Sequence, residues 1–441
     1  MKKISRRSFL TAAAACGAAA ALTACGGSAS STTTASSAAG STTASSAAAS
    51  GPVTLQWSVW DKESTPYWQA MADGYMASHS DVTIEMVDLG SSDYMTVLAT
   101  QLAGSADLDI VTIKDIPGYA NLINLDYLKP LNDVLTRDTA DFNGTIEQLT
   151  TDDGNFYAVP FRSDFWVLYY NKDLFDAAGV EYPSNDLTLA DYDALARKMT
   201  SGTGDGKVYG CHYHTWRSAA SLFSILDGKH TIIDGNYDFM KETYDMVIAQ
   251  QKDGICMDYG YLKTASLHYS AAFENQQCAM VNMGSWFIST LEAYMKDAET
   301  KFNWGIVKYP HPAGAPAGST LGTVTSLAIN ADSAKADTAA DFINWCVTED
   351  GAQAIAKTGT FPACGSAATS DIIKSTEGFP EDANSVDALT TSNVYLEMPY
   401  TQYASDIETI LNAEHDAIMT MSETVDEGIQ NMNDQVPAVL G

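Results

Sequence analysis

Three apolar stretches decide the fold of this 441-residue chain: VTLQWSVW at residues 53–60, VTIEMV at residues 82–87 and LDIVTI at residues 108–113. Each is short and rich in β-branched and aromatic residues, which is typical of strands. The two segments between them carry apolar residues at helical spacing. Strands that alternate with helices in this way indicate a parallel sheet covered by helices on both faces. The sequence therefore predicts an α/β fold.

The two intervening segments also carry helix-start signals. In the first, Pro66 follows Ser64 and Thr65, which is a common way to begin a helix. The apolar stripe of this helix consists of Trp68, Met71 and Tyr75. In the second, Ser91 and Ser92 are expected to cap the helix. Its apolar stripe consists of Tyr94, Leu98 and Leu102.

The predicted strand order locates a candidate site. Ligands of open parallel sheets bind beyond the carboxyl ends of the strands, which here carry Trp60-Asp61, Leu89-Gly90-Ser91 and Lys114-Asp115. None of these ends has the glycine-rich loop that binds phosphate. An aromatic ring, carboxylates, a hydroxyl and an amine suit a sugar, whose C–H faces pack on rings and whose hydroxyls hydrogen-bond. In the alternative interpretation, Trp60 belongs to the core and Asp61 caps the following helix.

The charge balance excludes several classes of protein. The chain has 24 Lys and Arg against 55 Asp and Glu, a net charge of −31. Basic residues do not cluster after residue 7, which argues against nucleic-acid binding. No apolar run reaches 18 residues, which argues against an integral membrane protein. A strongly anionic protein repels anions at long range, so we expect a neutral or cationic ligand.

The first 51 residues are expected to be an export signal and a tether. Residues 1–25 hold four basic residues and no acidic one, followed by an Ala-rich run. Leu22-Thr23-Ala24-Cys25 resembles a bacterial lipobox, in which Cys25 is acylated, and Ser5-Arg6-Arg7-Ser8-Phe9-Leu10 resembles a twin-arginine signal. The general secretory route remains open as an alternative. Residues 26–51 contain only Gly, Ser, Ala and Thr, the composition of a flexible linker. We therefore expect a lipid anchor at the outer face of the cell membrane, in an extracellular or periplasmic setting.

Removal of the signal makes the protein more acidic. It leaves 20 basic residues (24 minus 4) against 55 acidic ones, a charge near −35. Five cysteines remain in the body, an odd number that leaves at least one free thiol. They are Cys211, Cys256, Cys278, Cys346 and Cys364. We expect Cys346 to be buried, because it follows an apolar segment.

A second kind of site is suggested by Cys211-His212-Tyr213-His214, which places two imidazoles on one face of a possible strand. A metal-binding receptor is therefore an alternative function. A third ligand is not evident nearby in the sequence, and we predict neither a metal nor a cofactor.

The rest of the chain continues as α/β. Asp152-Asp153-Gly154-Asn155 predicts a tight turn. Strands are expected at residues 156–159, 165–170, 304–307 and 323–329, and helices at residues 187–199, 342–356 and 407–425. Residues 215–300 are expected to be mainly helical.

Most of residues 52–441 resembles an extracellular solute-binding protein of an ATP-binding-cassette importer, in the group that includes maltose-binding protein. The strongest match is YYNKDLF at residues 169–175. Weaker pieces keep the family order: DIV at 109–111, YAVP at 157–160, AG at 178–179, AM at 279–280, GSW at 284–286, FI at 342–343 and FPA at 361–363.

The resemblance implies a two-lobed periplasmic-binding-protein type II fold with a hinge and a ligand cleft between the lobes. It places the chain crossings near residues 160–169, 308–311 and 361–365. Lobe 1 would comprise residues 52–160 and 309–362, and lobe 2 residues 161–308 and 363–441. Contacts that exist only when both lobes touch the ligand would bias the protein toward a closed form.

The resemblance also implies the ligand-binding residues. Lobe 1 would supply Trp60, Asp61, Lys114 and Asp115, and lobe 2 would supply Asp164, Trp166, Trp216, Ser285, Trp286, Tyr400 and Tyr403. Each aromatic residue has a core position as its alternative, and Lys114 has an ion pair with a nearby acid. Cys364-Gly365-Ser366 lacks an Arg that some family members carry there, which weakens the case for an anionic sugar.

The predicted function is that of a monomeric lipoprotein, not an enzyme, that captures a neutral sugar or oligosaccharide and delivers it to the permease subunits of the importer. Two alternatives remain open. A carbohydrate-active enzyme would use two of Asp61, Asp115 and Asp164 as acid and nucleophile. A receptor for a peptide or a polyamine would suit the negative charge of the chain.

Overall fold

The structure is a computed structural model that describes residues 51–142 and 144–440. The predicted export signal, Cys25 and all but the last residue of the predicted tether lie outside the described residues. Among the helices of the described ranges, none combines the length and apolar character that a membrane span requires.

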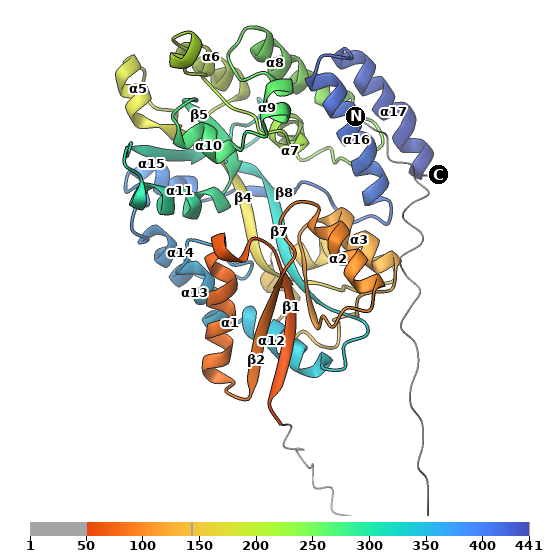
Figure 1. Ribbon diagram of the computed structural model, residues 1–441. Coiled ribbons are helices and arrows are strands. Elements are labelled where there is room, and N and C mark those ends of the chain that lie inside the picture. Colours follow the sequence, from red (N-terminus) through yellow and green to blue (C-terminus); the bar gives the residue numbers. More distant parts are fainter. Residues whose placement is uncertain (1–50, 143, 441) are drawn as a thin grey trace, which may run out of the picture. The chain divides into compact units, whose positions relative to one another are not determined.

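The first three strands form the predicted parallel arrangement (Figure 1). β1 (Val53–Val59) lies between β2 (Val82–Asp88) and β3 (Ile110–Ile113), and both pairs are parallel. The connecting helices are α1 (Pro66–Ser78), with Thr65 at its N-cap, and α2 (Tyr94–Ala103). All six residues of the two predicted stripes are buried. The α/β prediction is confirmed for this region.

The cap of α2 differs from the prediction. The residue before the helix is Asp93, in the left-handed conformation with φ 52°, and no side chain caps the helix N-terminus. The backbone amide and carbonyl groups of Ser91 instead form hydrogen bonds with Asp61 and Lys114 at the neighbouring strand ends.

The sheet becomes mixed after β3. The strand order is β2-β1-β3-β7-β4-β5. β7 (Ser319–Ile329) is antiparallel to both β3 and β4 (Val159–Asn171). The parallel pairing expected for the first three strands therefore does not extend beyond β3, because β7 runs antiparallel to its neighbours.

Strand β4 changes partners halfway along its length. Residues 159–165 pair with β7, whereas residues 166–171 pair with β5 (Met280–Gly284) and β6 (Trp304–Lys308). The two expected strands at 156–159 and 165–170 are one strand that starts at Val159. It tolerates Pro160 because the register shifts between Pro160 and Arg162. β4 and β7 connect the elements around β1 and β2 with those around α5 (Lys172–Ala178) and α6 (Leu189–Met199) (Figure 1).

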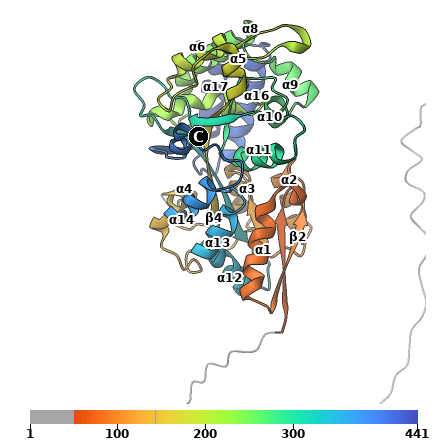
Figure 2. The ribbon, with the colours of Figure 1, turned by 90° about the vertical axis from the view of Figure 1, so that its left-hand side faces the viewer.

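The helix expected at residues 342–356 is two helices. α12 (Ala336–Cys346) ends before Thr348, whose side chain accepts a hydrogen bond from the Gly351 amide and caps α13 (Glu349–Ala356). Gly351 permits the close approach, because a Cβ there would lie 2.4 Å from the Trp345 carbonyl oxygen. α13 packs on α1, α12 and α14 (Ala367–Lys374) (Figure 2).

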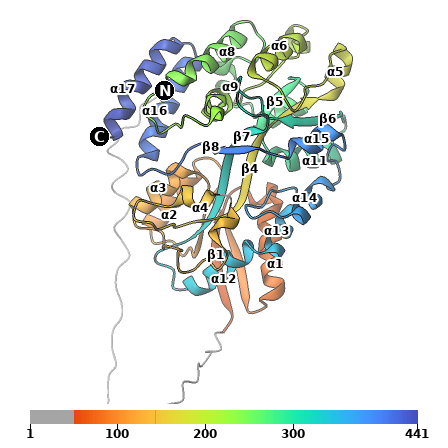
Figure 3. The ribbon, with the colours of Figure 1, turned by 180° about the vertical axis from the view of Figure 1, so that it is seen from behind.

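The helix expected at residues 407–425 also ends early. α16 (Ala404–Met419) stops before Met421, which has a φ of 57°, and α17 (Val425–Leu440) begins where the predicted helix should have ended. α16 packs on both α17 and α3 (Ile116–Asn124) (Figure 3).

The region 215–300 is mainly helical, as predicted, apart from β5. Its helices are α7 (Arg217–Ser221), α8 (Lys241–Lys252), α9 (Tyr259–Ala265), α10 (Tyr269–Glu274) and α11 (Trp286–Asp297). The remaining named elements are α4 (Thr145–Leu149), α15 (Ala383–Ala388), β8 (Asn393–Leu396) and five short 3-10 helices. Cys346 is buried as predicted, and the other four cysteines of the body are buried free thiols as well.

Candidate functional site

The ends of the three parallel strands converge on the backbone of Ser91. Asp61 adopts the left-handed conformation, with φ 46°, and its Oδ1 accepts a hydrogen bond of 3.2 Å from the Ser91 amide. The Lys114 ammonium donates to the Ser91 carbonyl oxygen over 2.7 Å. Burial lowers the pKa of Lys114, and the neighbouring Asp115 and Asp61 charges oppose that shift. The strand order thus brings the predicted first-lobe residues to one edge of the sheet.

Trp60 belongs to the core at this edge. It is only 8 % exposed, and its ring makes edge contacts with Trp68 and Tyr94, each at 5.0 Å between centroids. The Lys114 ammonium lies 5.2 Å from the centroid of the same ring, within the range of a cation–π interaction. Trp60 therefore supports Lys114 from the core side.

Asp115 combines two structural features. Its Oδ1 caps α3 by accepting a 2.7 Å hydrogen bond from the Gly118 amide. Asp115 keeps accessible surface. The protein around its carboxyl group nevertheless excludes enough water to raise its pKa, and the Glu408 charge on α16 raises it further. Asp115 therefore keeps accessible surface while it lies within the electrostatic influence of Glu408.

A buried ion pair lies where β4 changes partners. Arg162 Nε is 2.7 Å from Asp164 Oδ2, and the Asp164 side chain is 1 % exposed. Ser285, the residue before α11, donates from its hydroxyl to Asp164 Oδ1 over 2.7 Å. Arg162 also donates to the Tyr67 hydroxyl of α1 over 2.6 Å. Asp164 and Ser285 are thus buried in a network that ties α1, β4 and α11 together.

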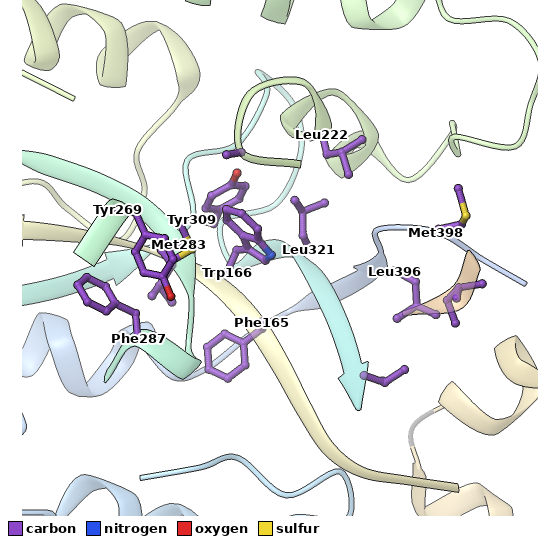
Figure 4. Packing of buried hydrophobic residues seen from close by; sticks show 14 of the residues in the cluster. Phe165, Trp166, Leu222, Tyr269, Met283, Phe287, Tyr309, Leu321, Leu396 and Met398 are labelled. Atoms are coloured by element: carbon purple, nitrogen blue, oxygen red, sulfur yellow. The ribbon is translucent and has the colours of Figure 1, made fainter. Parts of the chain in front are cut away.

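Trp166, two residues after Asp164 on β4, is buried in the cluster of hydrophobic residues shown in Figure 4. Its Nε1 donates to Glu397 Oε1 over 2.7 Å, and its ring makes edge contacts with Trp286 at 5.7 Å and Tyr309 at 5.9 Å. Burial raises the pKa of Glu397 to about 7, although its bonds from Trp166 and Thr323 act in the opposite direction. Trp166 is a core residue that supports the ring of Trp286.

The predicted tryptophans of the second side form an aromatic group. Trp216 is 42 % exposed, and its ring lies 4.6 Å from His214, 5.8 Å from Tyr269 and 6.2 Å from Trp286 between centroids. Trp286 is half-buried and donates from Nε1 to the Tyr269 hydroxyl over 3.0 Å. The buried Tyr269 is in electrostatic contact with Arg162 and Asp164, which links this group to the ion pair on β4.

Carboxylates outnumber cations around Arg217. The buried Arg217 donates from Nη2 to Glu408 Oε2 over 2.6 Å and from Nε to Asn412 Oδ1 over 3.2 Å. It also interacts electrostatically with Glu397. Glu397 and Glu408 interact with Arg217, and Asp61 and Asp115 interact with Lys114. These four carboxyl groups outnumber the two cations. The pair of Arg162 and Asp164 is left out of this count because its charges cancel.

The two predicted tyrosines lie near α3 and α16. Tyr400 is half-buried, and its ring makes an edge contact with Tyr119 of α3 at 5.8 Å. Tyr403, also half-buried, is the residue before α16. The carboxylates of Asp152 and Asp153 act electrostatically on Tyr400. The Gln402 carbonyl between the two tyrosines accepts a hydrogen bond from Asn124 at the end of α3.

The structure adds residues that sequence reasoning missed, chiefly Arg162, Tyr269 and Glu408, and it brings His214, predicted only as part of a possible metal site, beside Trp216. The sequence held a signal for Arg162 and His214. Each lies two positions before a predicted site residue, Asp164 and Trp216 respectively, and this spacing places side chains on one face of an extended chain. In residues 51–142 and 144–440, no group of three His, Cys, Asp or Glu side chains is arranged to hold a metal ion.

The arrangement can bind a polyhydroxylated molecule. An exposed tryptophan offers a flat apolar surface, and the strand ends offer carboxylate oxygens and one ammonium for hydrogen bonds. Hydrogen bonds to charged groups are stronger than neutral ones. The excess of carboxylates disfavours an anionic ligand.

Sequence comparisons identify the family and the export signal of the chain. Residues 61–353 match the model of the bacterial extracellular solute-binding proteins, and residues 3–23 match the signal sequence of the twin-arginine translocation pathway, which identifies the export route. A sn-glycerol-3-phosphate-binding periplasmic protein of Pectobacterium atrosepticum is 24 % identical over 416 residues, with 85 % of this chain and 90 % of the relative covered.

Solved structures show the same fold. A sugar transporter from Rhizobium etli in an open conformation has a TM-score of 0.77 and 47 % identity, covering 87 % of this chain and 99 % of its own. A substrate-binding protein from Listeria monocytogenes in complex with cycloalternan has a TM-score of 0.74 at 20 % identity, covering 88 % and 99 %. This exported chain therefore belongs to the bacterial extracellular solute-binding protein family, whose members are non-enzymatic solute-binding components of ATP-binding-cassette importers.

Proposed function

We propose that this protein captures a neutral sugar or oligosaccharide between two lobes and delivers it to the permease of its importer. The proposal rests on the chemistry of two sets of residues, an exposed ring at Trp216 and strand ends that present Asp61, Lys114 and Asp115. Rings and carboxylates together match the alternating C–H faces and hydroxyls of a pyranose.

The recess is proposed to lie between these two sets of residues. Asp115 is exposed while the protein around it raises its pKa, as expected for a carboxyl group in the wall of a concave surface. Lobe 1 would comprise residues 52–160 and 309–362, and lobe 2 residues 161–308 and 363–441. β4 is the natural hinge strand, because its two halves pair with different neighbours.

The proposed ligand contacts divide by burial. Asp61, Lys114, Asp115, Trp216, Trp286, Tyr400 and Tyr403 retain accessible surface. Trp60, Asp164, Trp166 and Ser285 are buried and would position the first group. Two similar proteins are named for different ligand classes: the Pectobacterium protein for a phosphorylated polyol, which is anionic, and the Rhizobium protein for a sugar. The charge around the site favours the neutral class.

A thermal-shift screen of the purified full-length chain in mild detergent tests the proposal. Maltose, mannobiose, mannotriose and cycloalternan, the ligands of structurally similar proteins, represent neutral sugars. The comparison ligands are sn-glycerol 3-phosphate, spermidine and a neutral tripeptide. A ligand at about 100 times its Kd stabilises the native state by about 2.7 kcal/mol. We expect a shift with at least one neutral sugar; a shift confined to the comparison ligands refutes the proposal.

The same chain is proposed to be held at the membrane through acylated Cys25, with residues 26–51 as the tether. Metabolic labelling with a radioactive fatty acid tests this directly. Label should enter the wild-type protein and be lost in Cys25→Ala, whereas equal labelling of both proteins would exclude this anchor.

A further inference from the structure

His214 is a polar side chain whose surroundings leave it without a partner. It is 8 % exposed, its Nδ1 is buried, and no described residue forms a hydrogen bond to that nitrogen. Three aromatic rings lie near it: Trp216 at 4.6 Å, Tyr269 at 5.2 Å and His268 at 5.5 Å between centroids. Buried polar groups are nearly always hydrogen-bonded in native structures, so this exception needs an explanation.

The neighbouring His212 provides a contrast. Both of its nitrogens are buried and without partners among the described residues, whereas only Nδ1 of His214 is buried in this way and its Nε2 is not. His214, two residues further on, lies against the one strongly exposed tryptophan of the aromatic group. A ligand on Trp216 would therefore come within reach of His214 and not of His212.

The ring of Trp216 is held so that a ligand can stack on it. Its described ring contacts, with His214, Tyr269 and Trp286, are edge-on or tilted, with interplanar angles of 83°, 62° and 57°. None is a face-to-face stack, and 42 % of the residue remains exposed. No described aromatic neighbour therefore stacks flat on the ring, and part of its surface stays accessible.

Burial also settles the charge of His214. It lowers the pKa of His214 to about 3, and the adjacent His212 and His268 act in the same direction. A neutral imidazole has one donor and one acceptor nitrogen, and a hydroxyl group can accept from the first or donate to the second. It would not neutralise a phosphate.

We propose that His214 is a specificity-determining ligand contact that hydrogen-bonds a hydroxyl of a neutral sugar stacked on Trp216. This inference rests on the proposed function, because it assigns one contact within that site. The ligand would approach the Nε2 edge of the ring, because Nδ1 is buried, and the contact selects against sugars that lack a hydroxyl at that position.

The experiment compares three variants with the wild-type full-length chain, using whichever of maltose, mannobiose, mannotriose and cycloalternan produces the largest thermal shift. His214→Phe keeps a planar ring and removes both polar nitrogens, whereas His214→Gln keeps a donor and an acceptor. His212→Phe is the matched control two residues away. The melting temperature without sugar verifies that each variant folds, and calorimetric titration gives Kd.

We expect His214→Phe to raise Kd by about tenfold, the loss of roughly one neutral hydrogen bond, and His214→Gln to recover part of it. His212→Phe should keep the wild-type Kd. An unchanged Kd in His214→Phe, or an equal loss in His212→Phe, overturns the inference while the proposed function stands. If no sugar shifts the wild-type protein, the proposed function fails and the inference fails with it.

Discussion

Removal of the carboxylate of Asp164 is the sharpest test of how the site is held together. In Asp164→Asn, the buried Arg162 loses the charged oxygen that lies 2.7 Å from its Nε. The Asp164 side chain is 1 % exposed and that of Arg162 is 11 % exposed, so water has little access to the position of the lost partner. Breaking a buried ion pair by removing one partner costs roughly 3–5 kcal/mol.

Two retained contacts place the expected loss near the lower end of that range. The Ser285 hydroxyl can still donate to the amide oxygen of the introduced side chain, and Arg162 keeps its 2.6 Å bond to Tyr67. A loss of about 3 kcal/mol is therefore expected. With an unfolding entropy of about 2.1 cal/mol/K per residue over roughly 390 folded residues, this lowers Tm by about 4 °C.

Urea denaturation followed by circular dichroism measures the change. Asp107→Asn is a matched control, because the Asp107 side chain is 86 % exposed and its nearest cation, Lys335, is 3.9 Å away. It should change the stability by less than about 0.5 kcal/mol. The double variant Arg162→Met, Asp164→Leu should be more stable than Asp164→Asn, since no charge is left buried. A loss below about 1 kcal/mol in Asp164→Asn would show that water reaches Arg162 and that the network does not hold β4.

Three further outcomes are expected. Burial raises the pKa of Glu292 from its ordinary value of 4.5 to about 8. Between these two pH values the folded protein keeps a proton on Glu292 that the unfolded chain releases. The stability of the folded protein therefore falls as the pH rises from 4.5 to about 8. Glu292→Gln should remove about 3 kcal/mol of that loss between about pH 5 and pH 8, as urea titrations at both values would reveal; parallel pH profiles of variant and wild type contradict the assignment. Trp286→Ala should weaken sugar binding at least about tenfold in calorimetry, because its ring is half-buried beside Trp216, and an unaltered Kd would remove it from the site. Gly210→Ala should destabilise the protein by at least about 1–3 kcal/mol in thermal denaturation, since its Cβ would lie 1.7 Å from the Ala196 carbonyl oxygen, and a wild-type Tm would show that the backbone can shift there.

The sequence alone determined the features that depend on local patterns. The alternation of apolar stretches between residues 53 and 113 specified β1, α1, β2, α2 and β3, because their side-chain periods are local properties. The export signal and the family motifs are likewise contiguous strings of residues. Element boundaries were less accessible: the single helix expected at 342–356 missed the cap by Thr348, since an apolar stripe continues across a short break.

Tertiary structure decided which of the candidate residues face a ligand. The sequence does not distinguish Trp60, Trp166 and Trp216. In the structure, Trp60 and Trp166 are buried, whereas Trp216 is 42 % exposed. Strands covered on both faces do not alternate between apolar and polar residues, so their sequence does not distinguish core rings from site rings. The polar partners are equally remote: Arg162 meets Tyr67 across 95 residues, and Trp166 meets Glu397 across 231. Such contacts arise only when distant segments pack, and they decide which charges are buried, which are paired and which remain free to bind.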